Sequence, residues 1–225
     1  MTDQAHYSGH VAAGGPPSSR AVGGLTVTKM SVGPMDNNAY LLVCTDTRDA
    51  LLIDAANDAD RLLALLAVQQ PAVRLAGVLT THRHQDHWQA LTRVLAATGA
   101  ATLAGAADAD GLPVPVDVRL EDGDSITVGA VSLAVIALRG HTPGSIAIRY
   151  DEPSGAVHLF TGDSLFPGGP GRTASAADFT SLMDDLEARV FSPLPDGTWV
   201  YPGHGDDTTL GAERPHLSEW RARGW

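Results

Sequence analysis

The chain has 225 residues, of which 44% are hydrophobic and 18% charged, and its formal net charge is -11 at pH 7. This composition is typical of a globular protein and not of a disordered one. So acidic a chain disfavours nonspecific binding to nucleic acid or to anionic lipid. Cys44 is the only cysteine, which excludes an internal disulfide. We find neither the apolar core of a signal peptide nor an apolar run of membrane-spanning length. We therefore expect a cytoplasmic protein with no nucleic-acid or membrane partner. These numbers leave the oligomeric state open.

The first half of the chain begins with a segment unlike the rest. Residues 1–24 are rich in glycine, proline and serine, and we expect a flexible or loosely packed N-terminal arm. From residue 25 onward, apolar runs and alternations predict strands, and apolar residues at helical spacing predict helices. Strands are predicted at 25–32, 40–44, 50–54, 75–80 and 101–104, and helices at 60–68 and 86–97.

The second half repeats this order of elements. Strands are predicted at 126–128, 131–138, 145–150, 157–160 and 199–201, and helices at 176–190 and 215–222. Elements that alternate in two similar halves pack naturally as two facing sheets with helices outside them. Because no low-complexity linker interrupts residues 25–225, we expect a single domain there.

One short segment concentrates metal-ligand residue types. His82, His84, Asp86 and His87 fall within six residues, directly after an apolar strand and at the start of a predicted helix. Alternate residues of an extended loop can point the same way, so His82 and His84 can bind the same metal ion. Imidazole and carboxylate suit zinc, and they also suit iron and manganese. A merely solvated polar loop is the alternative, and the density of ligand types makes it the weaker interpretation.

Three later loops each add one residue of the same kind. His141, Asp163 and His204 lie in glycine-containing loops, and each loop follows an apolar strand. Enzymes with alternating strands and helices keep their functional groups at such strand ends, because a rigid strand aims the loop residue. The four segments together therefore predict one metal-dependent active site.

The motif His82-x-His84-x-Asp86-His87, followed by His141, Asp163 and His204, resembles that of the metallo-β-lactamase superfamily and, within it, the glyoxalase II group. The resemblance implies a four-layer αββα sandwich of the α/β (α+β) class, with two divalent metal ions, zinc above all, at one edge. By position, the first metal would be held by His82, His84 and His141, and the second by Asp86, His87 and His204. Asp163 would bridge the two metals. Asp54 matches an early aspartate of the family that supports the metal loop from behind, although an ordinary turn aspartate explains it nearly as well.

The resemblance implies a small-molecule substrate and, as the reaction, hydrolysis of a thioester or ester. Two metals about 3.5–4 Å apart can share a water and acidify it, and the resulting bridging hydroxide would attack the acyl carbon. Asp86 would orient that hydroxide and help to move its proton. In residues 166–173, Arg172 is the nearest fixed cation that could bind a substrate carboxylate, and a brace to an acidic neighbour is the equal alternative.

Two departures shape the expected function. The few residues after His204 leave no counterpart for the glutathione-binding helical domain of glyoxalase II, so the resemblance predicts a short form with an unidentified carrier thiol. The alternative function is that of a persulfide dioxygenase-like oxidoreductase on the same fold. It would use one iron held by His82, His141 and Asp163.

Overall fold

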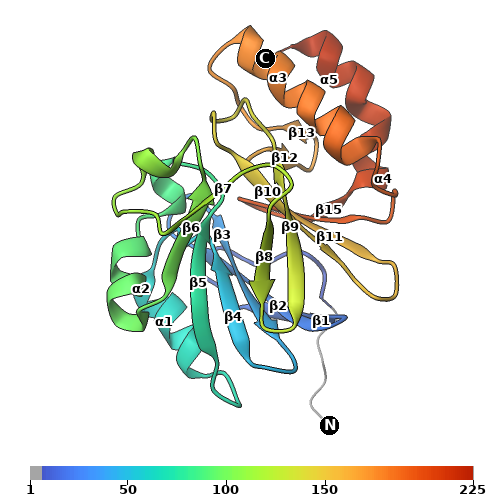
Figure 1. Cartoon of the computed structure of the whole chain (residues 1–225). Helices are drawn as coiled ribbons and strands as arrows, with labels where there is room; N and C mark the ends of the chain where they lie inside the picture. Colours follow the sequence, from blue (N-terminus) through green and yellow to red (C-terminus); the bar gives the residue numbers. More distant parts are fainter. Residues whose placement is uncertain (1–6, 225) are drawn as a thin grey trace.

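Two β-sheets face each other in the structure, a computed structural model that describes residues 7–224 (Figure 1). The first sheet has seven strands in the order of the chain, antiparallel from β1 to β4 and parallel from β4 to β7. Its strands are β1 (Ser18–Val22), β2 (Leu25–Val32), β3 (Asn37–Cys44), β4 (Asp49–Ile53), β5 (Arg74–Thr80), β6 (Ala101–Gly105) and β7 (Val118–Leu120).

The second sheet has six strands in the order β15-β14-β11-β10-β9-β8, and only the pair β11 and β14 is parallel. Its strands are β8 (Ser125–Val128), β9 (Val131–Ala137), β10 (Ile146–Asp151), β11 (Val157–Gly162), β14 (Trp199–Pro202) and β15 (Thr208–Thr209). A separate small hairpin is formed by β12 (Leu165–Phe166) and β13 (Gly169–Pro170).

Helices cover the outer faces of both sheets (Figure 1). They are α1 (Ala59–Ala67), α2 (Leu91–Thr98), α3 (Ala176–Asp185), α4 (Leu210–Glu213) and α5 (Leu217–Arg223). Helix α3 continues into a π-helical turn at Leu186–Phe191, and 3-10 turns occupy Gln85–His87, Ala109–Gly111 and Arg214–His216. No helix within residues 7–224 has the length and apolar character needed to cross a membrane.

Strand residues alternate between two packing partners, which explains the layers. In β4, Leu51 and Ile53 face the core between the sheets, whereas Leu52 packs with the side chains of α1 and α2. In β11, Phe160 belongs to the same central core, whereas Leu159 packs with α3. A strand that buries both faces is predominantly apolar, as these two strands are over Ala50–Ile53 and Leu159–Phe160. The predicted αββα sandwich is confirmed.

The helix predicted at 86–97 does not form as one element. Gln85–His87 is a 3-10 turn, and α2 begins only at Leu91. The backbone N–H groups of Gln89 and Ala90 donate to the carbonyls of Ala56 and Ala55, 3.1 and 3.0 Å away. These donors are therefore tied to the loop after β4, and the helix starts after them.

The prediction of a loosely packed N-terminal arm was wrong for much of its described part. Residues 18–22 form β1, which pairs along its whole length with β2. Tyr7 is 8% exposed and belongs to the core between the sheets, and Val11 is buried too. Residues 1–6 lie outside the described residues, and the single domain over 25–225 stays a prediction.

Candidate metal centre

The seven ligand-type residues come from both sheets and lie at one edge of the sandwich. The first sheet supplies His82, His84, Asp86 and His87, from the loop and 3-10 turn that follow β5. The second sheet supplies the loops that follow β9, β11 and β14, which carry His141, Asp163 and His204. Within residues 7–224 these side chains form three overlapping groups able to hold a metal: His82 with His84 and His141, His82 with His87 and Asp163, and Asp86 with His87 and His204.

The first group has the spacing of a coordination shell. Nε2 of His82 lies 3.1 Å from Nδ1 of His84 and 3.2 Å from Nε2 of His141. Nitrogen ligands 2.0–2.1 Å from a tetrahedral zinc ion would be about 3.3 Å apart. Three ring nitrogens that face one point at this separation can serve together as ligands of one metal ion.

The second group is equally compact and adds carboxylate oxygen. Nε2 of His87 and Nε2 of His204 are 3.2 Å apart. Oδ2 of Asp86 lies 3.3 Å from the nitrogen of His204 and 3.5 Å from that of His87. Two nitrogens and one oxygen suit the same borderline divalent cations as the first group.

Asp163 lies between the two groups. Its Oδ2 is 3.6 Å from Nε2 of His141 and 3.5 Å from Nε2 of His204, while its Oδ1 is 3.3 Å from Nε2 of His87. Oδ1 is buried and makes no hydrogen bond within the described residues. Burying a carboxylate oxygen that receives no hydrogen bond is costly unless a cation binds it. The position of Asp163 therefore fits a ligand that bridges two metals.

The outer nitrogens of four imidazoles are anchored, which leaves the inner nitrogens free for a metal. Nδ1 of His87 contacts Asp54 at 2.9 Å, and Nδ1 of His82 contacts Thr81 Oγ1 at 3.1 Å. The other two anchors are backbone carbonyls, those of Arg172 for His141 at 2.7 Å and of Met35 for His204 at 2.9 Å. Such outer contacts fix the tautomer and orientation of metal-ligating histidines.

Asp54 supports the metal loop from within the protein. It is 1% exposed, and its carboxylate accepts hydrogen bonds from the backbone N–H and the hydroxyl of Thr81, both 2.8 Å long, besides contacting His87. Its φ of 56° is unusual for a residue with a side chain. These three contacts hold Asp54 in that conformation and link β4 to the loop after β5.

Two further residues that the sequence analysis did not single out hold the ligand loops. Asp108 is fully buried and accepts hydrogen bonds from Arg83 N, Thr142 Oγ1 and Gly144 N, so it joins the loop of His82 to the loop of His141. Asn37 donates from Nδ2 to Asp86 Oδ2 at 2.9 Å. Asp108 follows the end of a strand, as the ligands do, and this position could have drawn attention to it.

Glycine is required where the loops approach most closely. A Cβ atom on Gly203 would lie 2.1 Å from Oδ1 of Asp163 and 2.8 Å from Cε1 of His87. No side chain can occupy that space, so the residue before His204 must be glycine for the two sheets to bring their ligands together.

The protonation states of the two groups differ in the metal-free protein. Burial would lower the pKa of His87, but the negative charges of Asp54 and Asp163 outweigh it and raise the pKa to about 10. Burial likewise opposes protonation of His204, yet hydrogen bonds with Asp163 and Asp86 raise its pKa to about 10. Burial lowers the pKa of both His82 and His141. His82 and His141 are therefore neutral in the metal-free protein, whereas His87 and His204 are protonated.

Metal uptake is expected to release at least two protons per chain at pH 8, because both cationic imidazoles must lose a proton to become ligands. Titration calorimetry in two buffers of different ionisation enthalpy measures this number. The first metal equivalent should release few protons and the second should release most of them. A release close to zero over both equivalents would contradict the assignment of His87 and His204 as ligands.

The same shifts predict how pH affects the metal-free fold. Both pKa values lie above the ordinary histidine value of 6.5. The protonated imidazoles therefore stabilise the metal-free fold fully below pH 6.5, and this contribution is lost as the pH rises through 10. Unfolding of the chelated protein should accordingly become easier between these two values.

The loop 166–173 lies beside two of the ligands. The ring of Phe166 is 6.3 Å from the ring of His204, and the carbonyl of Arg172 anchors His141. Arg172 is exposed, and within residues 7–224 its guanidinium takes part in no hydrogen bond or ion pair. The described residues therefore contain no acidic partner for a bracing role.

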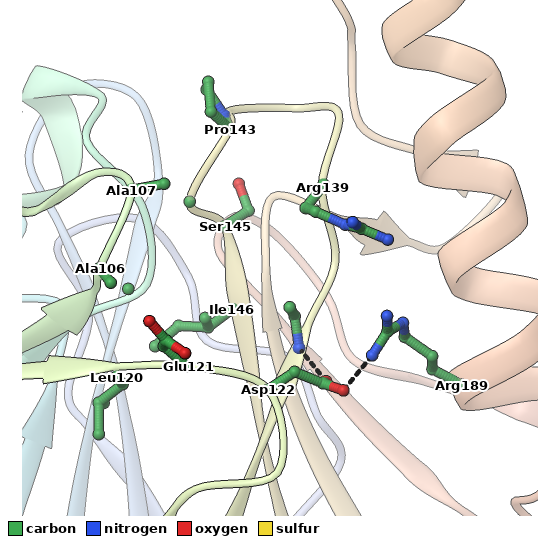
Figure 2. A pocket seen from close by; sticks show the side chains of 13 residues that line it. Ala106, Ala107, Leu120, Glu121, Asp122, Arg139, Pro143, Ser145, Ile146 and Arg189 are labelled. Carbon is green, nitrogen blue, oxygen red and sulfur yellow. Dashed lines mark hydrogen bonds and ion pairs between the residues drawn. The ribbon is translucent and has the colours of Figure 1, made fainter.

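A surface pocket of about 350 Å³ adjoins the loop of His141 (Figure 2). None of the seven ligand-type residues lines it. Arg139 binds both carboxylate oxygens of Asp185 through Nε and Nη2, at 2.9 and 2.8 Å. Arg189 pairs with Asp185 and with Asp122. The charges in this region are thus largely paired with one another, and they brace the start of the His141 loop.

Comparisons with known proteins agree with this geometry. A family model described as the metallo-beta-lactamase superfamily matches residues 32–204. The curated hydroxyacylglutathione hydrolase of Fuscovulum blasticum is 40% identical over 171 residues, which are 75% of this chain and 62% of that relative. The chain therefore spans less than two thirds of the length of that relative.

Two solved structures share the fold over most of their length. BLEG-1, a B3 metallo-beta-lactamase, superposes with a TM-score of 0.70 at 30% identity, covering 84% of this chain and 96% of that one. TTHA1623 in a di-iron-bound form superposes with a TM-score of 0.69 at 33% identity, covering 83% of this chain and 96% of that one. With its αββα layers, its converging histidines and aspartates and a family match over residues 32–204, the chain belongs to the metallo-beta-lactamase superfamily.

Proposed function

We propose that this chain is a two-metal hydrolase of a small thioester or ester, with hydroxyacylglutathione-like thioesters as the first candidate substrates. The observation that carries the proposal is the position of Asp163, whose two oxygens lie within 3.6 Å of ring nitrogens from both groups. The identity to hydroxyacylglutathione hydrolases supports the thioester class. The di-iron form of TTHA1623 supports room for two metals in a site of this kind.

We propose zinc as the metal, because the donors are imidazole and carboxylate, although iron and manganese accept the same set. Bound metals would acidify a water and polarise the substrate carbonyl. The histidines fix the two positions, and Asp163 supplies the negative charge shared between them. The hydrogen bond with His204 holds the pKa of Asp86 well below its usual value, so this carboxylate is ionised at neutral pH. Its side chain is 21% exposed, and it can therefore orient a water and accept its proton.

The decisive experiment combines metal analysis with a substrate panel. Protein purified without added metal is analysed for zinc, iron and manganese, and then assayed on a hydroxyacylglutathione, the matching oxygen ester and a β-lactam. We expect close to two metals per chain and turnover fastest on the thioester. One iron per chain, with oxygen consumed in the presence of a persulfide, would replace the proposal with the dioxygenase alternative.

Arg172 is proposed to bind a carboxylate of the substrate. Its guanidinium is exposed, and its own carbonyl holds His141. Replacing Arg172 with alanine leaves that carbonyl in place and is expected to raise KM about tenfold for carboxylate-bearing esters, which corresponds to ~1.4 kcal/mol of lost binding. KM for neutral esters should stay unchanged. The matched control is Arg93→Ala, an exposed arginine on α2. Equal losses on both ester types, with a lower melting temperature, would make Arg172 a structural residue.

A further inference from the structure

The N-terminal segment lies against the loop that carries His204. Residues 7–11 have no regular secondary structure, and burial alternates along them, with Tyr7, Gly9 and Val11 buried. The carbonyl of Gly9 accepts a hydrogen bond from the backbone N–H of Asp207, 3.1 Å away. We call residues 7–11 the strap. It contacts the chain only a few residues beyond His204.

Lys29 fastens the strap to this loop. It is the only lysine of the sequence and is fully buried. Its Nζ donates to three acceptors: the carbonyl of Gly9 at 2.7 Å, the carbonyl of Gly205 at 2.6 Å and Oδ1 of Asp207 at 2.7 Å. All three protons of the ammonium group are thereby used. A buried charge of this kind is tolerated only when its geometry is well satisfied, and here two acceptors belong to the His204 loop and one to the strap.

The side chain of Tyr7 adds a second attachment. Its hydroxyl donates to Oδ2 of Asp207 at 2.7 Å, an oxygen that also accepts from Trp199 Nε1 at 2.8 Å. The Tyr7 ring lies 6.2 Å from the ring of Trp199 and 6.5 Å from that of Tyr201. Both aromatic residues are in β14, the strand that leads to His204. From β1, the guanidinium of Arg20 lies 5.2 Å above the Tyr7 ring.

The loop is also held from the start of β3. Nδ2 of Asn38 donates to the carbonyls of Pro202 and Gly205, both at 2.9 Å. The carbonyl of Gly205 therefore accepts from Asn38 and from Lys29 at once. Between the end of β14 and the start of β15 the chain forms no helix, and these contacts together hold the residue that follows His204.

We propose that the strap and Lys29 are a positioning device for His204, which sets the affinity of the metal position formed by Asp86, His87 and His204. This inference rests on the proposed two-metal function. Within the described residues, the polar and aromatic contacts of the strap are with β1, β2, β14 and residues 206–207, and none of them is with the first group. Loosening the strap therefore weakens the second metal position selectively.

Two glycines with similar backbone conformations allow a matched test. Gly9 has a φ of 83°, and a Cβ there would lie 2.8 Å from Cβ of Asp207. Gly14 has a φ of 67°, and a Cβ there would meet nothing within 4 Å. Gly9→Ala and Gly14→Ala thus impose the same kind of unfavourable backbone conformation, but only Gly9→Ala displaces the strap from the loop.

The experiment measures zinc affinity for each of the two positions by competition with chelators, together with the imidazole NMR signal of His204 in the metal-free proteins. For Gly9→Ala we expect the second zinc to bind at least tenfold more weakly, the first to bind unchanged and the His204 signal to shift. Gly14→Ala should match the wild type in all three. Tyr7→Phe, which removes one oxygen, should weaken the second zinc to a smaller degree and serves if Gly9→Ala does not fold.

Unchanged affinity for the second zinc in Gly9→Ala and in Tyr7→Phe would overturn the proposal, as would equal weakening of both positions. If the wild type binds only one metal, the two-metal function fails, and the NMR comparison still decides the positioning role. An unchanged His204 signal in the metal-free Gly9→Ala protein then overturns it.

Discussion

Replacing Asp86 with alanine is expected to lower kcat for thioester hydrolysis at least 100-fold, which corresponds to ~2.7 kcal/mol of activation free energy. Oδ2 of Asp86 lies within hydrogen-bond distance of Asn37 and within 3.5 Å of His87 and His204. The variant therefore loses a metal ligand and the carboxylate proposed to accept the proton. The side chain is partly exposed and lies in a short 3-10 turn, so its removal should leave no core cavity.

Steady-state kinetics with a metal-saturated enzyme checks this result. The matched control is Asp110→Ala, which removes an exposed carboxylate from another 3-10 turn, Ala109–Gly111. Its kcat should stay close to that of the wild type. A loss of less than about tenfold in Asp86→Ala, or ~1.4 kcal/mol, would show that the role assigned to Asp86 is wrong.

Replacing Asp163 with asparagine is expected to reduce bound zinc from about two ions per chain to one at most, and to abolish turnover. The amide has nearly the shape of the carboxylate, but it carries no charge and cannot offer two anionic oxygens to two cations. The donors that remain in the first group are three imidazoles, so one metal can still bind there. Elemental analysis after gel filtration gives the stoichiometry directly.

Asp117→Asn is the matched control, because it makes the same chemical change at an exposed carboxylate that binds Thr102. It should retain both zinc ions and full activity. Two tightly bound zinc ions in Asp163→Asn would remove the bridging role from Asp163. Far-ultraviolet circular dichroism of both variants separates loss of metal from loss of the fold.

The layers of the fold could be predicted because a strand that is buried on both faces is recognisable in the sequence as a run of apolar residues. Every residue of β3 and β11 is buried, most of these residues are apolar, and turn residues flank both strands. The break between residue 87 and α2 could not be predicted in this way. It depends on carbonyls of Ala55 and Ala56, some thirty residues earlier in the chain, which compete with the helix for the N–H groups of Gln89 and Ala90.

The N-terminal arm illustrates the same limit in the opposite direction. Glycine and proline made residues 1–24 look loosely packed, yet single buried residues such as Tyr7 attach residues 7–24 to the core. In the candidate site, the seven ligand-type residues were recognisable because each lies in a segment that follows a strand. Asp108 and Lys29 act through hydrogen bonds to partners 20 to 178 residues away, and no local sequence pattern indicates such partners.

Each sheet of the sandwich brings an incomplete set of donors to the edge where they meet. Two members of the first group and two of the second follow β5 in the first sheet, and one member of each comes from the second sheet. Neither half of the chain alone can assemble either group. A metal bound there is a cross-link between the halves. It takes the place of an internal disulfide, which a chain with a single cysteine cannot form. During folding, tight metal binding must therefore follow the docking of one sheet on the other. Once bound, the metals oppose separation of the two sheets.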